Sequence, residues 1–207
     1  MSFPTPTTLY RGAAAAGAGS ALVLLVNAAK RAEVISTTAF TQLVAPLAQI
    51  LALVLVVGLY MAFGRRAGRF GLVAFLVNAF ALIALVGVEF VINLVFAELP
   101  TSTIETLREG PLGVALTVAS VMFLLGTLSF VATMIRGREL PTVPLVMYVV
   151  GAVPIALRAF VPEAVLDLGL LTLAVGIAWL AGWFFRWASA PTSPARAVFT
   201  PVPTNVR

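Results

Sequence analysis

Cysteine and histidine are both absent from this chain of 207 residues. Without cysteine there is no disulfide framework, no thiol nucleophile and no thiolate metal ligand. Without histidine there is no Ser-His pair, no H-E-x-x-H zinc motif and no imidazole ligand for haem. The chain also has a single aspartate, Asp167, which excludes a paired-aspartate protease. We therefore expect no catalytic residue, no metal and no cofactor, and we interpret the protein as a non-enzyme.

Charged residues are scarce, at 10% of the chain, whereas soluble domains carry about 25%. The hydrophobic residues make up 61%, and they form blocks roughly 20 residues long, the length that crosses a bilayer as a helix. Such blocks favour helices over the alternating strands of a membrane barrel. The net charge of +5 comes mostly from short loops beside these blocks, so it indicates membrane topology and not nucleic-acid binding. We predict an all-α, polytopic transmembrane helix bundle whose main partner is the lipid bilayer.

Six apolar blocks are separated by short polar or basic stretches, and they predict one six-helix transmembrane domain over residues 11–187. A short segment, 1–10, precedes this domain, and a flexible Pro-rich tail, 188–207, follows it. The predicted helices span about 11–29, 41–63, 70–96, 111–135, 142–161 and 164–187.

The first block opens with small residues from Gly12 to Ser20, which let another helix approach closely and favour an interior helix. A cleavable signal peptide is the other interpretation of this block. Its apolar stretch would be Ala21 to Val26, and its small-residue cleavage site would be Val26-Asn-Ala28. We expect the block to be retained as a helix.

Local motifs refine three places in this layout. Pro46 should kink the second helix near its start, because proline lacks the N–H that a helix needs. Ser102 and Glu105 have the spacing of a capping box and predict a short interfacial helix between the third and fourth blocks. The fifth helix is the weakest, since Gly151, Pro154 and Arg158 interrupt its second half.

Basic residues predict the orientation. The thirteen lysines and arginines divide into nine on the side of the amino terminus, the turns 64–71 and 136–141 and the tail, against four on the other side. Cytoplasmic loops carry the excess of Lys and Arg, so we expect both termini inside. The four on the outer side are Lys30, Arg31, Arg108 and Arg158.

Glu89 is the first candidate for a binding site, because a carboxylate inside a membrane span must be paired, protonated or in contact with water. Asn93 lies one helical turn further on the same face. Asn27 and Arg158 map to the same outer half, so the four predict a small polar pocket opening outward. The alternative is a Glu89–Arg158 or Glu89–Lys30 ion pair that only fixes helix packing. Lys30 is the only lysine, but beside Arg31 it is better explained by snorkelling than by a Schiff base.

The last block carries Trp179, Trp183 and Trp187 at intervals of four residues, which predicts an aromatic stripe. An interfacial belt explains most of it, but Trp179 lies deeper and can contact a lipid, a partner helix or a pigment. Trp179 and Trp183 are therefore candidate binding residues. Arg65, Arg66 and Arg69 are candidates for contact with an anionic lipid headgroup, although the positive-inside rule already predicts them.

The basic turn from Gly64 to Gly71, the sequence Val88-Glu-Phe90 and the turn from Arg136 to Pro141 resemble those of uncharacterised bacterial, mostly actinobacterial, six-helix membrane proteins. This resemblance implies a fold and a multi-pass protein of the bacterial cytoplasmic membrane, and it implies no activity.

For function we expect a bundle that acts by binding, as an accessory or assembly component or as a receptor for a lipid or small apolar ligand, with a membrane-protein partner or a homo-oligomer as its further partner. A small oligomeric transporter or channel that uses Glu89 and Asn93 is the main alternative. A membrane enzyme acting through Glu89 or the outer carboxylates Glu163 and Asp167 is the third interpretation.

Overall fold

The computed structural model describes residues 6–158 and 160–190, and all regular structure in these ranges is helical, which confirms the all-α expectation. Segments 1–5 and 191–207, with most of the predicted tail, lie outside the described residues. The helices are α1 (Pro6–Arg31), α2 (Ala39–Val44), α3 (Leu47–Ala62), α4 (Gly68–Phe90), α5 (Thr101–Glu109), α6 (Pro111–Gly137), α7 (Thr142–Ala156) and α8 (Glu163–Ser189). Short turns η1 (Gly64–Ala67), η2 (Val91–Val95) and η3 (Phe96–Glu98) join them.

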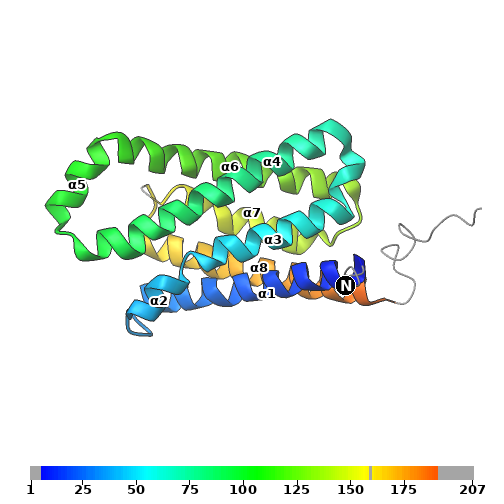
Figure 1. Ribbon diagram of the computed structural model, residues 1–207, viewed down its shortest axis with the longest axis horizontal. Helices are drawn as coiled ribbons and strands as arrows, with labels where there is room; N and C mark the ends of the chain where they lie inside the picture. Colours follow the sequence, from blue (N-terminus) through cyan, green and yellow to red (C-terminus); the bar gives the residue numbers. More distant parts are fainter. Residues whose placement is uncertain (1–5, 159, 191–207) are drawn as a thin grey trace, which may run out of the picture.

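Six helices form a closed ring in which each packs against two neighbours. The order around the ring is α1, α3, α4, α6, α7 and α8, and α8 returns to α1. The helices lie along the long axis of the molecule (Figure 1). One end of the ring, here the α5 end, carries α2, α5 and the start of α8, and the other, the η1 end, carries η1, the start of α1 and the end of α8 (Figure 1). The two arginine-rich turns predicted to share one side of the membrane therefore lie at the same end of the ring.

Five helical segments are long and apolar enough to cross a membrane, and α7, with 15 residues, is a shorter apolar helix. The outward surface of these segments is apolar as well: Leu22, Phe80, Leu125 and Leu168 are each more than half exposed. Apolar side chains distributed over the whole circumference have no favourable contact with water. Length and surface are thus both compatible with a multi-pass membrane protein.

Two prolines lie at helix ends. α2 ends at Val44 and α3 begins at Leu47, so the helix is interrupted at Pro46, where the sequence predicts a kink. α7 ends at Ala156, earlier than the predicted end at residue 161. Pro154 lies in its last turn, where it removes a backbone donor, and Leu157 leaves the helical conformation.

The capping box predicted at Ser102 is wrong. α5 does form, but it begins at Thr101 after the extended residue Pro100, and no side chain caps it. Ser102 lies inside the first turn, so its hydroxyl is not at the capping position. A capping box occurs instead at Thr38 and Thr41, at the start of α2.

The core of the η1 end is aromatic. Phe184 of α8 is fully buried and contacts the rings of Tyr10, Phe63 and Trp187, at centroid distances of 5.8, 6.0 and 5.6 Å. Trp183 packs on Phe63 at 5.8 Å. This cluster joins α1, the end of α3 and α8, and α1 lies between the other two in the ring. It stabilises the end of the bundle opposite α5.

Candidate functional site

At the α5 end, α4 runs directly into the π-helical turn η2, and this turn positions Asn93. A π-helical turn interrupts the regular hydrogen-bond ladder of an α-helix and is frequent at functional sites. The amide nitrogen of Asn93 donates to the backbone oxygen of Glu89, at 3.0 Å, and to its carboxylate Oε2, at 2.8 Å. The side chain of Asn93 thereby satisfies the backbone and orients the carboxylate.

Asn93 also joins this carboxylate to α1, because Lys30 Nζ donates to Asn93 Oδ1 at 2.6 Å. The direct ion pairs considered from the sequence do not form: in residues 6–158 and 160–190, neither Lys30 nor Arg158 makes a salt bridge to Glu89. The proximity of Asn93 to Glu89 was predicted, but its hydrogen bond to Lys30 was not. The structure places this neutral amide between Lys30 and Glu89.

A cavity of about 220 Å³ lies over these groups, inside the α5 end of the ring, and we call it the central cavity. Four residues predicted from the sequence line it together, namely Asn27, Glu89, Asn93 and Arg158. Gln49 of α3, Lys30 and Arg31 also line it, and none of these three was among the predicted site residues. A polar side chain inside an apolar block was the available signal for Gln49.

Two buried polar atoms of residues that line the central cavity have no hydrogen-bond partner among the described residues. Asn27 is only 8% exposed, and its Oδ1 is buried without a hydrogen bond. The Oε1 atom of Gln49 is in the same situation. Buried polar groups are normally hydrogen-bonded, and unpaired ones cost about 1–3 kcal/mol each. The wall is therefore suited to a bound molecule that brings polar atoms of its own.

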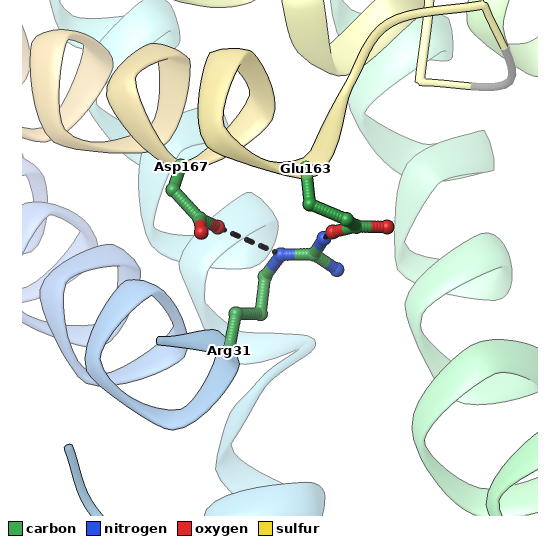
Figure 2. Close-up of polar contacts among 3 residues, drawn as sticks. All are labelled: Arg31, Glu163 and Asp167. Atoms are coloured by element: carbon green, nitrogen blue, oxygen red, sulfur yellow. Dashed lines mark hydrogen bonds and ion pairs between the residues drawn. The ribbon is translucent and has the colours of Figure 1, made fainter. Parts of the chain in front are cut away.

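Arg31 closes the edge of this site by joining α1 to α8. Figure 2 shows its guanidinium between the carboxylates of Glu163 and Asp167, both from the first turns of α8. Nε of Arg31 donates to Asp167 Oδ1 at 3.2 Å, and an NH2 group of Arg31 pairs with Glu163. The charge of this arginine is thus balanced within the protein.

The two carboxylates around Arg31 should contribute unequally to stability. The side chain of Asp167 is 26% exposed and that of Glu163 is 82% exposed. We expect Asp167→Asn to lower the free energy of unfolding by about 1 kcal/mol or more, because a half-buried charged hydrogen bond is lost. Glu163→Gln should lower it by less than about 0.5 kcal/mol, since water screens an exposed pair. Thermal unfolding of both variants in the same detergent checks this, and equal shifts would contradict it.

A second cavity of about 340 Å³, the lateral cavity, lies beside the central one between α4, α6, α7 and α8. Its wall is mainly apolar, with Val88, Leu116, Val121 and Leu157 among its residues. Ile92, Arg158 and Leu166 line both cavities, so the two adjoin.

Below the central cavity the ring is packed. The spaces that follow toward the η1 end measure about 30 Å³ and about 10 Å³. Asn78 lies in this packed region with 0% exposure, and its Oδ1 accepts a hydrogen bond from Thr127 at 3.4 Å. The central cavity is therefore a blind one in this conformation.

The other candidate residues lie elsewhere. Trp179 is 47% exposed on the surface of α8, and Trp183 belongs to the aromatic core of the η1 end, so neither lines the central cavity. Arg65 and Arg69 are exposed at the η1 end. Arg66 is there as well and pairs with Glu139 of the turn between α6 and α7.

Comparison with known proteins gave no match among protein-family models, curated proteins or solved structures.

Proposed function

We propose that this protein is a six-helix integral membrane protein of the bacterial cytoplasmic membrane with both termini inside. The apolar circumference and the five long apolar helices support this. α7 is the sixth span in this proposal. With 15 residues it covers about 22 Å at 1.5 Å per residue, less than the roughly 30 Å of a bilayer core. α7 packs between α6 and α8. In this proposal the residues that connect it to α8, or a local thinning of the bilayer, make up the remaining length. The arginine-rich η1 end is then cytoplasmic.

Its function in this proposal is to bind an amphipathic small molecule or lipid at the outer, α5 end, without catalysis. One observation carries the proposal: the central cavity is blind and has a wall that is half apolar and half polar, with unpartnered polar atoms. Binding sites for small molecules are typically concave and mostly apolar with a few placed polar groups. The protein can also act as an accessory or assembly component. In that case a helix of a partner protein supplies the polar atoms that pair with the cavity wall.

A small oligomeric transporter or channel is the second candidate. The chain of contacts from Lys30 through Asn93 to Glu89 favours it, because linked ionisable groups inside a bundle are typical of ion and proton paths. Its path has to pass the packed region around Asn78, so it requires a second conformation or a route between copies of the chain. The blind cavity makes binding the better supported function.

Native mass spectrometry of the full-length protein, gently extracted from its own membrane, tests the proposal. We expect a retained amphiphile in the wild type and its loss in Asn27→Phe, where the larger ring fills the central cavity. Leu25→Phe is the matched control, because Leu25 is 40% exposed on the outside of the same helix, and it should keep the bound molecule. Melting temperatures of both variants report whether they fold. A ligand-free monomer would contradict binding, and a bare homo-oligomer would support the transporter instead.

A further inference from the structure

Arg158 occupies the junction between the central and the lateral cavity. It follows the end of α7, and its side chain belongs to the walls of both spaces. A group held by this guanidinium can therefore extend into either space. The two volumes, about 220 and 340 Å³, together lie within the range of small-molecule sites, about 300–1,000 Å³.

The charges around the two cavities leave Arg158 without a counter-ion in contact. Arg31 is balanced by Asp167 and Glu163. Arg158, in contrast, forms no hydrogen bond and no salt bridge with any described residue. Glu89 and Glu163 attract it from a distance, but Glu89 is hydrogen-bonded to Asn93 and Glu163 is paired with Arg31.

Lys30 adds to this imbalance, because its hydrogen bond goes to the neutral Asn93. Apart from Arg31, which is paired with Asp167 and Glu163, the central cavity is lined by two cations, Lys30 and Arg158, and one carboxylate, Glu89. A partly buried cation in a medium of low dielectric constant requires a partner of opposite charge. Neither Lys30 nor Arg158 has a counter-ion in direct contact among the described residues.

The lateral cavity offers a place for a hydrocarbon chain beside this cation. Its apolar residues come from α4, η2, α6, α7 and α8 and from the connection before α8, and the lining residues Val121 and Leu157 are 51% and 39% exposed. Phe160, another lining residue, is 86% exposed. An open apolar space adjoining the bilayer is accessible to a lipid chain.

We propose that this site binds a single-chain anionic amphiphile, whose carboxylate or phosphate pairs with Arg158 and whose acyl chain lies in the lateral cavity. This inference depends on the proposed binding function and specifies its ligand class. Arginine suits the role because its planar donors bind carboxylate and phosphate in a bidentate way. The uncompensated charge of Arg158 and its position next to the apolar space carry the inference.

Titration of the purified full-length protein in a neutral maltoside detergent, followed by native mass spectrometry, tests it. Three probes separate head from chain: palmitate, monopalmitoylglycerol with the same chain and a neutral head, and inorganic phosphate without a chain. The wild type should bind palmitate at least about tenfold more tightly than monopalmitoylglycerol, since a charged hydrogen bond is worth about one decade or more. Arg158→Gln should remove this preference, and Arg158→Lys should keep part of it. Arg186→Gln, which removes an exposed arginine at the opposite end, should leave it unchanged.

The outcomes separate this inference from the proposed function. If Arg158→Gln retains the preference for palmitate, or if the wild type has none, the assignment to Arg158 is overturned while amphiphile binding stands. Equally tight binding of inorganic phosphate would overturn the role of the chain. Binding of none of the three probes would overturn the proposed function too. If Arg158→Gln does not fold, Arg158→Lys takes its place. An undiminished preference for palmitate in Arg158→Lys would then overturn the assignment to Arg158.

Discussion

Gly151→Ala is expected to lower the free energy of unfolding by about 3 kcal/mol, the upper range for overpacking a core. Gly151 lies where α7 and α8 approach most closely. A Cβ atom added there would come within 2.4 Å of the backbone nitrogen of Leu173 and within 2.7 Å of the backbone oxygen of Gly169. Backbone atoms cannot rotate away as a side chain can, so the two helices must separate. Thermal unfolding in detergent, followed by tryptophan fluorescence, measures the loss.

Gly182→Ala is the matched control on α8. A Cβ atom at Gly182 has nothing within 4 Å, and alanine is the better helix former. We expect its stability to equal that of the wild type or to exceed it slightly. If both variants unfolded at the same temperature, close packing of α7 on α8 would not be what holds this part of the ring together. The effect matters for the site, because Arg158 lies in the connection between α7 and α8, and α8 carries the lining residues Leu166, Leu170 and Leu173.

Much of the fold follows from the sequence because long apolar blocks and prolines act locally. The positions of α1, α6 and α8 and the break at Pro46 depend on residues close to one another in the chain. The end of α7 and the start of α5 were predicted less well, since each depends on which residue next to a proline leaves the helical conformation. The order of helices around the ring was not predicted at all. Helices that are apolar on every side do not indicate which face meets which neighbour.

For the candidate site, too, one part was predictable from the sequence and another was not. Glu89, Asn93, Asn27 and Arg158 were grouped correctly in space because polar residues are rare inside apolar blocks, and the structure brings them to one cavity. The partners of each residue could not be predicted. Lys30 bonds to Asn93 and not to Glu89, and this depends on the π-helical turn and on how α1 lies against it. The role of these residues in binding stays a prediction.

The second large loss of stability is expected in the aromatic core of the η1 end, where α8 contributes Phe184. Phe184 and Phe185 are adjacent in sequence, but Phe184 is 0% exposed and Phe185 is 40% exposed. Phe184→Ala should lower the free energy of unfolding by about 3 kcal/mol, the lower end for removal of a buried aromatic ring. The reason is lost packing: its ring contacts Tyr10, Phe63 and Trp187, and the space left behind has no other atoms to fill it.

Phe185→Ala is the matched control, because it removes the same aromatic ring from the exposed side of the helix. The difference between the two variants therefore measures the effect of burial. Its main contact is the guanidinium of Arg11, 4.9 Å from the ring, and an exposed cation–π contact is worth about 0.5–1 kcal/mol. In a bilayer the lost ring is replaced by lipid, so no cavity forms. We therefore expect a loss below about 1 kcal/mol, measured by the same thermal unfolding. Because both residues share a helix and a substitution, equal losses would mean that the buried face of α8 is not packed as the ring requires.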